Sequence, residues 1–288
     1  MVSFSSRLKI NREEEHFFQY KIVLLYQISN MKIKEVVVAL ERFAPLPLQE
    51  SYDNAGLQIG LTEAEASGVL LCLDVTEAVI REAEERGCNL VIAHHPLLFR
   101  GLKRVSDTTY VERCVREAIL RGIAVYAAHT NLDNARGGVN FKIAEKLGLE
   151  NVRFLEEQGE GGSGIVGDLP VPEAPMDFLK RVKRTFEVEC LMHNQGPQRE
   201  VRTVAVCGGA GDFLLGNAIQ AQADVFLTGE MGYHLYFGHE SDIWIGVLGH
   251  YQSEQFTIEL LQEILNRAYP ELPTCLIRIN TNPILYLK

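Results

Sequence analysis

Residues 90–99 read LVIAHHPLLF, and this stretch places two adjacent histidines at the end of an apolar run. The short apolar segment from Leu90 to Ala93 predicts a buried β-strand. Pro96 has no N–H for a sheet hydrogen bond, so we expect the strand to end at the histidines. At a strand end both imidazoles can turn toward one cleft. His94 and His95 are therefore candidate metal ligands, although one packed and one exposed histidine is the alternative interpretation.

The overall composition is that of a globular protein. The chain has 288 residues, of which 47% are hydrophobic and 23% charged. Its formal net charge of −10 argues against a nucleic-acid partner. The six cysteines are widely spaced and show no C-x-x-C pair, which indicates neither a zinc ribbon nor a disulfide framework. Together with the absence of a secretory signal, this predicts a cytoplasmic protein.

The first thirty residues differ from the rest of the chain. The apolar segment at residues 22–26 is far shorter than the ~20 residues that a membrane-spanning helix needs. Three glutamates at residues 13–15 precede it, whereas a signal peptide begins with basic residues. We interpret residues 1–30 as an N-terminal extension outside the core, with Met31 as a plausible native start, and we expect no membrane association.

The chain after Met31 alternates helices and strands. The predicted order in the first half is a helix over about 33–44, a strand at 69–73, a helix over 76–86, a strand at 90–93, a helix over 109–120, a strand at 123–128 and a helix ending near 147. Thr76 is the expected N-cap of the second helix. Alternating strands and helices predict a mainly parallel sheet with ligands at the carboxyl ends of its strands.

A similar pattern recurs in the second half. The glycine- and glutamate-rich segment 156–167 is predicted to be a loop, and further predicted strands lie at 204–207, 225–228, 243–248, 274–277 and 283–286. The spacing from Cys72 to His94 equals that from Cys207 to Gly229, which is weak support for an internal repeat. We therefore predict an α/β fold of two similar lobes, each a mainly parallel sheet flanked by helices. Lobe one covers about 31–150 and lobe two about 165–288, with a metal site in the cleft between them.

Further candidate ligands follow other predicted strands. Asp133 lies just beyond the strand at 123–128, although it could instead cap a helix. His250 and Glu254 are one helical turn apart and can face the same point, although a glutamate there would also suit the helix dipole. With His94 and His95, these residues make five ligands. That number exceeds the needs of one tetrahedral catalytic zinc ion and favours two divalent ions of zinc, manganese or iron.

The chain resembles the GTP cyclohydrolase 1 type 2 homologue family over nearly all of residues 31–288. The motifs that carry the resemblance are YDNAGL (52–57), HHPLLF (94–99), HTNLD (129–133), TGE (228–230) and GHYQSE (249–254). The resemblance implies two α/β lobes, a toroidal homohexamer and a dinuclear metal site with a bridging carboxylate. Its metal ligands would be His94, His95, Asp133, His250 and Glu254. The chain is similar to the short members that lack an inserted middle domain.

Three positions depart from the family pattern. Tyr52 stands where tryptophan is frequent, and Ser253 stands where threonine is common. Many relatives have paired histidines in the region where this chain has Tyr233 and His234. We therefore assign His234 no role in substrate handling.

The resemblance implies a metal-dependent hydrolase that acts on a small-molecule substrate, with a nucleotide such as GTP as the candidate. Glu230 or His129 could move protons, and a supporting role beside the ligands is the alternative for both. The glycine turn at 208–211 could bind a phosphate, although a tight turn is the simpler interpretation. The alternative is a protein without catalytic activity, either a metal-delivery protein or a ring-shaped interaction scaffold, but the hydrolase is the preferred interpretation.

Overall fold

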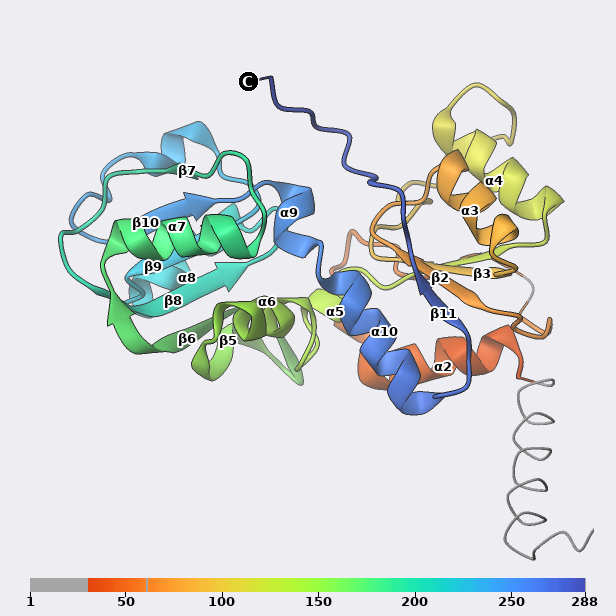
Figure 1. The fold of residues 1–288 in the computed structure, drawn as a ribbon, viewed down its shortest axis with the longest axis horizontal. Coiled ribbons are helices and arrows are strands. Elements are labelled where there is room, and N and C mark those ends of the chain that lie inside the picture. Colours follow the sequence, from red (N-terminus) through yellow and green to blue (C-terminus); the bar gives the residue numbers. More distant parts are fainter. Residues whose placement is uncertain (1–30, 61, 288) are drawn as a thin grey trace, which may run out of the picture.

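The computed structural model describes residues 31–60 and 62–287, so the predicted extension at residues 1–30 lies outside the described residues. The described chain forms two β-sheets that lie side by side, each flanked by helices (Figure 1). This arrangement confirms the predicted α/β fold class.

The first sheet is mainly parallel. Its strands, in spatial order, are β1 (Gly56–Ile59), β4 (Ala124–Ala127), β3 (Leu90–Ala93), β2 (Val69–Cys72) and β11 (Thr274–Leu276). Only β1 runs antiparallel to its neighbour. One face packs on α3 (Glu77–Glu85) and α4 (Tyr110–Leu120), and the other on α2 (Ile33–Phe43) and α10 (Thr257–Ala268). Because both faces are covered, the central strands are apolar throughout, as in LVIA of β3.

Helices α3 and α4, on the first face, both have a threonine side chain as N-cap. The Thr76 hydroxyl accepts a hydrogen bond from the Val79 N–H, which confirms Thr76 as the N-cap of α3. Thr109 caps α4 in the same way, through the Glu112 N–H. These caps satisfy N–H groups that have no partner within the helix and so define where each helix begins.

The second sheet is mixed, so the prediction of a mainly parallel sheet in each lobe is wrong for this one. Its strands, in spatial order, are β5 (Glu150–Gln158), β6 (Gly161–Glu173), β8 (Val201–Cys207), β9 (Val225–Thr228), β10 (Trp244–Val247) and β7 (Met192–His193). The central three strands are parallel, whereas β5, β6 and β7 pair antiparallel to their neighbours. Helices α6 (Val139–Leu147), α7 (Pro175–Thr185) and α8 (Leu215–Gln220) flank this sheet.

The predicted loop at residues 156–167 is wrong, because these residues belong to the β5–β6 hairpin. The glycines that suggested a loop serve close packing within the hairpin. A Cβ atom at Gly162 would lie 2.4 Å from the Glu156 carbonyl oxygen, and Gly164 has a positive φ of 59°. Glycine therefore marks close backbone approach here.

The C-terminal part of the chain returns to the first lobe. Helix α9 (His250–Glu254) follows β10 of the second sheet, and α10 then leads to β11, which pairs with β2 of the first sheet (Figure 1). The side chain of Arg86, at the C-terminal end of α3, donates a hydrogen bond of 2.7 Å to the carbonyl oxygen of Leu276. This bond connects β11 to α3. The predicted last strand at 283–286 is wrong, since these residues form no strand. The crossing places α9 between the two lobes.

The packing of the hairpin glycine can be tested by substitution. We expect Gly162→Ala to lower the free energy of unfolding by about 1–3 kcal/mol, because the added methyl group has no room. Gly216→Ala is the matched control, since its Cβ would meet nothing within 4 Å and alanine favours helix α8 by up to ~1 kcal/mol. Urea denaturation measures both. Equal stability of the Gly162→Ala variant and the native chain would contradict the close-approach argument.

Candidate metal centre

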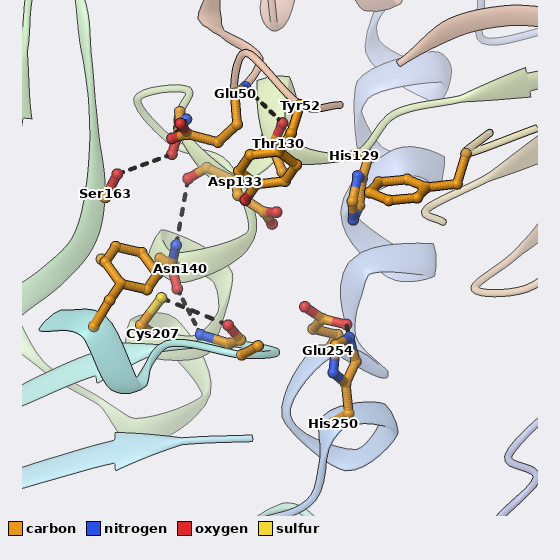
Figure 2. Close-up of a pocket in the computed structure, with 16 residues that line it drawn as sticks. Glu50, Tyr52, His129, Thr130, Asp133, Asn140, Ser163, Cys207, His250 and Glu254 are labelled. Atoms are coloured by element: carbon orange, nitrogen blue, oxygen red, sulfur yellow. Dashed lines mark hydrogen bonds and ion pairs between the residues drawn. The ribbon is translucent and has the colours of Figure 1, made fainter. Parts of the chain in front are cut away.

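The candidate ligands meet in the cleft between the lobes. His94 and His95 follow β3 and His129 follows β4, whereas Asp133 ends the short helix α5 (Thr130–Asp133). His250 and Glu254 both come from α9. Figure 2 shows His129, Asp133, His250 and Glu254 around a cavity of about 220 Å³. The parallel strands therefore present their carboxyl ends to this cleft, as expected for an α/β sheet.

Ligand atoms of these residues form three overlapping groups. Within each group the atoms lie within 4.8 Å of one another, and the groups are His94–His95–His129, His95–His250–Glu254 and His94–Asp133–Glu254. The structure thus brings together the five ligands predicted from the sequence and adds His129. We call these six residues the histidine–carboxylate cluster. A cluster of this kind could hold a metal ion.

Glu254 lies at the centre of the cluster. Its Oε2 atom is 3.0 Å from His95 Nε2 and 3.3 Å from His250 Nε2, and its Oε1 atom is 3.6 Å from His94 Nε2. The residue is only 4% exposed. A buried carboxylate needs cationic or hydrogen-bonding partners, and the imidazoles around Glu254 supply them.

The far nitrogen of each cluster imidazole is also held. The Nδ1 atoms of His95, His129 and His250 lie 2.7–2.8 Å from carboxylate oxygens of Asp74, Asp53 and Glu230, in that order. The Nδ1 atom of His94 lies 2.8 Å from the Ala128 carbonyl oxygen. All four rings therefore direct Nε2 into the cluster. Metal-binding histidines are held in the same way in known sites.

Two of these supporting carboxylates were not assigned a role from the sequence. Asp74 lies two residues after the end of strand β2, and Asp53 lies within the YDNAGL motif, where it resembles an ordinary turn residue. Burial would raise the pKa of Asp53, but hydrogen bonds from His129 and Thr130 outweigh it and lower the pKa to about 2. The position of Asp74 just beyond an apolar strand, next to the strand that precedes His95, could have identified it from the sequence.

The two predicted proton shuttles occupy different places. His129 lines the cavity and contributes Nε2 to the cluster. Glu230 lies behind His250 with its side chain 58% exposed, and it is not among the residues that line the cavity. The Glu230 carboxylate accordingly faces the ring of His250.

Opposite charges perturb the pKa values within the cluster. Burial alone would lower the pKa of His95, but hydrogen bonds to Asp74 and Glu254 outweigh it and raise the pKa to about 10. The hydrogen bond to Glu254 is the main cause that raises the pKa of His250 to about 9. Burial opposes ionisation of Glu254, yet His94 and its other imidazole neighbours hold its pKa well below the usual value. Without a metal ion, protonated imidazoles therefore balance the Glu254 carboxylate.

One buried atom fits a metal ion particularly well. His94 Nε2 is buried and has no hydrogen-bond partner among the described residues. It lies 3.6 Å from Glu254 and 3.7 Å from Asp133, beyond hydrogen-bonding distance. Two ligands on one tetrahedral zinc ion are about 3.4 Å apart, given bonds of ~2.0–2.1 Å. These residues thus fit a shared ion, which would give the His94 nitrogen the partner that it lacks.

The glycine turn at 208–211 does not support the predicted phosphate site. The N–H groups of Gly208, Gly209 and Gly211 already donate to side chains of Asn140, Ser253 and Thr228, in that order. A Cβ atom at Gly209 would lie 2.3 Å from Glu254 Oε1. The turn therefore makes room for the Glu254 carboxylate.

The fold and the site define a class of protein, namely a two-lobed α/β protein with a histidine–carboxylate cluster between its lobes. The family model described as Duf34/NIF3 (NGG1p interacting factor 3) matches residues 31–283. The chain belongs to this family, and the resemblance seen in its sequence motifs is confirmed.

Relatives span most of the chain. A GTP cyclohydrolase 1 type 2 homologue of Clostridium acetobutylicum is 31% identical over 245 residues, which cover 83% of this chain and 91% of that protein. NIF3-like protein 1 of Drosophila melanogaster is 31% identical over 261 residues, covering 88% and 87%. The crystal structure of Staphylococcus aureus protein SA1388 superposes with a TM-score of 0.83 at 26% identity, covering 90% of this chain and 100% of that one.

The raised histidine pKa values predict that metal binding releases protons. At pH 7 the metal-free chain holds protons on His95 and His250, whose pKa values are about 10 and 9, whereas a metal ion binds neutral imidazole. The apparent affinity for Zn²⁺ should therefore rise from pH 7 to pH 9. The stabilisation from these charged imidazoles is fully present below pH 6.5 and is lost as the pH rises through 9 and 10.

Titration calorimetry in buffers of different ionisation enthalpy measures the number of protons released. Asp74→Asn should lower that number at pH 7, because His95 then loses one of the carboxylates that raise its pKa. Zinc binding at pH 7 without proton release would contradict these charge states.

Proposed function

We propose that this chain is a dinuclear metal-dependent hydrolase that acts on a small heterocyclic substrate, with a nucleotide as the candidate. The observation that carries the proposal is the buried Glu254 carboxylate among three imidazoles, with the unpartnered His94 nitrogen beside it. The two Glu254 oxygens face different imidazoles, so this carboxylate could bridge two ions. The proposed ligands are His94, His95, His129, Asp133, His250 and Glu254.

The donor set limits which ions would bind. Imidazole nitrogens and carboxylate oxygens suit zinc, manganese or iron. Cys207 also lines the cavity, but burial raises the pKa of its thiol far above the usual value. A protonated thiol is a poor metal ligand, so sulfur ligation plays no part in the proposal.

The residues around the ions would prepare them for hydrolysis. When bound, two divalent ions supply a hydroxide nucleophile near neutral pH and polarise the substrate. Asp53, Asp74 and Glu230 keep the imidazoles oriented through their Nδ1 atoms. Tyr52 and Phe213 leave more than half of their surface exposed where they line the cavity, and an aromatic substrate ring could stack on them. Their position supports a planar heterocyclic substrate.

The size of the cavity favours a second candidate function. Its volume of about 220 Å³ lies below the ~300–1,000 Å³ of typical ligand pockets. A metal-binding protein that delivers ions to another protein needs no larger space. The alternative is therefore a metal-delivery protein, or a ring-shaped scaffold, without catalytic activity. The names of the relatives favour the hydrolase, since several are called GTP cyclohydrolase 1 type 2 homologues.

The proposal extends to assembly and location. We place the protein in the cytoplasm as a toroidal homohexamer, following the resemblance in its motifs. The free state of its six cysteines supports a reducing compartment. Across residues 31–60 and 62–287, no helix combines the length and apolar character needed to cross a membrane.

Removal of central ligands tests the hydrolase. We expect His94→Ala and Glu254→Ala to lose bound metal and to reduce GTP turnover by at least ~100-fold, because each deletes a ligand at the centre of the cluster. His234→Ala and Glu240→Ala are matched controls, since both residues are exposed and lie outside the cluster. Elemental analysis and a nucleotide turnover assay give the two readouts.

The outcomes separate the candidates. Full metal content in both ligand variants would refute the metal centre. Bound metal with no turnover of any nucleotide, together with transfer of ions to an apo-enzyme, would replace the hydrolase with the delivery protein.

A further inference from the structure

A second cavity lies on the other side of His95. It has a volume of about 300 Å³, and its lining includes Asp74, Tyr110, Thr281 and His95. Of the six cluster residues, His95 alone lines this second cavity, and His95 is absent from the lining of the cleft cavity. Its Nε2 atom faces Glu254 and its Nδ1 atom faces Asp74. The imidazole of His95 therefore separates the second cavity from the centre of the cluster.

The C-terminal arm, residues 277–287, forms part of the wall of this cavity. It runs from β11 past α9 to the end of the chain (Figure 1), and Thr281 and Pro283 belong to the cavity lining. The Thr281 hydroxyl donates to Asp74 Oδ2 over 3.0 Å. Farther along, the Gln252 amide donates to the Tyr286 hydroxyl over 3.4 Å. These polar contacts tie the arm to both sides of the metal centre.

The apolar side chains near the end of the arm are largely exposed, so few buried contacts hold it in place. Leu285 is 91% exposed and Ile284 is 52% exposed. Segments with few buried apolar contacts open at low free-energy cost, so local opening of the arm is cheap compared with unfolding of the lobes. The side-chain hydrogen bonds of Thr281 with Asp74 and of Tyr286 with Gln252 are therefore important for holding this part of the arm in place.

A single carboxylate connects the arm to the ligand. Asp74 accepts from Thr281 through Oδ2 and holds His95 Nδ1 at 2.8 Å through Oδ1. Departure of Thr281 leaves Asp74 bound only on its inner side and opens the cavity to solvent. The His95 ring then lies between the opened cavity and Glu254.

The chemistry of the lining suits a divalent cation. The Asp74 carboxylate and the hydroxyl groups of Thr76, Tyr110 and Thr281 offer oxygen atoms along the cavity. Oxygen atoms are the ligands that hard divalent cations take in proteins. The net charge of −10 also draws cations toward the chain.

We propose that this second cavity is the route by which divalent ions enter and leave the metal centre, and that the C-terminal arm is its gate, with Thr281 as the latch. The inference rests on the proposed metal centre and does not depend on the reaction. A gate changes the rates of uptake and release by the same factor and leaves the equilibrium affinity unchanged. A contact that only positions His95 changes the affinity instead.

Removal of the latch tests the gate. We expect Thr281→Val to speed both zinc uptake by the metal-free full chain and zinc release to an excess of chelator by about tenfold, because the lost hydroxyl removes the hydrogen bond to Asp74 and the interaction with Tyr251. The zinc dissociation constant and the number of ions bound should stay as in the native chain. Stopped-flow fluorescence with a zinc-sensitive chelator measures the two rates, and circular dichroism checks the fold.

Two control variants accompany this test. Thr281→Ser retains the hydroxyl, and Leu285→Ser alters an exposed residue of the same arm, so both should exchange zinc at the native rates. Native rates in Thr281→Val would overturn the gate, as would faster release with unchanged uptake, which would show that Thr281 only stabilises His95.

Different results would refute the proposed hydrolase function and the proposed gate. A native chain that takes up no zinc refutes the metal centre and the gate together. Absence of nucleotide turnover in a chain that binds zinc refutes only the hydrolase.

Discussion

The structure depends on one buried charge, the carboxylate of Glu254. Three imidazoles contact it from two separate segments of the chain, one after β3 and one within α9. A buried charge that loses its partner costs about 3–5 kcal/mol, so the two segments must meet for the fold to tolerate Glu254. Protonated imidazoles meet this need in the metal-free chain, and divalent ions would meet it in the loaded one. The need to neutralise Glu254 therefore holds α9 against the end of β3, at the site where metal ions would bind.

The position of helix α9 and the space at Gly209 accommodate the Glu254 carboxylate. Helix α9 lies where the chain crosses from the second sheet back to the first, so its residues reach His94 and His95 of the other lobe. The backbone at Gly209 leaves space that a side chain would take from Glu254, and the Ser253 hydroxyl accepts the Gly209 N–H. Beyond the ligands, Asp53, Asp74 and Glu230 fix the imidazole rings. Thr281 of the C-terminal arm in turn donates a hydrogen bond to Asp74.

The sequence predicts the parts of this arrangement that depend on local patterns. The strand ending at His94 follows from apolar residues and a proline, and the pairing of His250 with Glu254 follows from helical spacing. The β5–β6 hairpin could not be predicted, because glycines such as Gly162 serve close packing that only the folded chain reveals. The return of the three-residue strand β11 to the first sheet depends on long-range contacts. Asp53 and Asp74 acquire their roles only through histidines more than twenty residues away.

The central claim is that the histidine–carboxylate cluster binds a pair of divalent ions bridged by Glu254. Anomalous diffraction from crystals of the full chain grown with zinc, recorded on both sides of the zinc absorption edge, tests it most directly. The account predicts two anomalous peaks per chain in the cleft, one on each side of the Glu254 carboxylate. A cleft without a peak, or zinc bound only at surface residues outside the cluster, would contradict it.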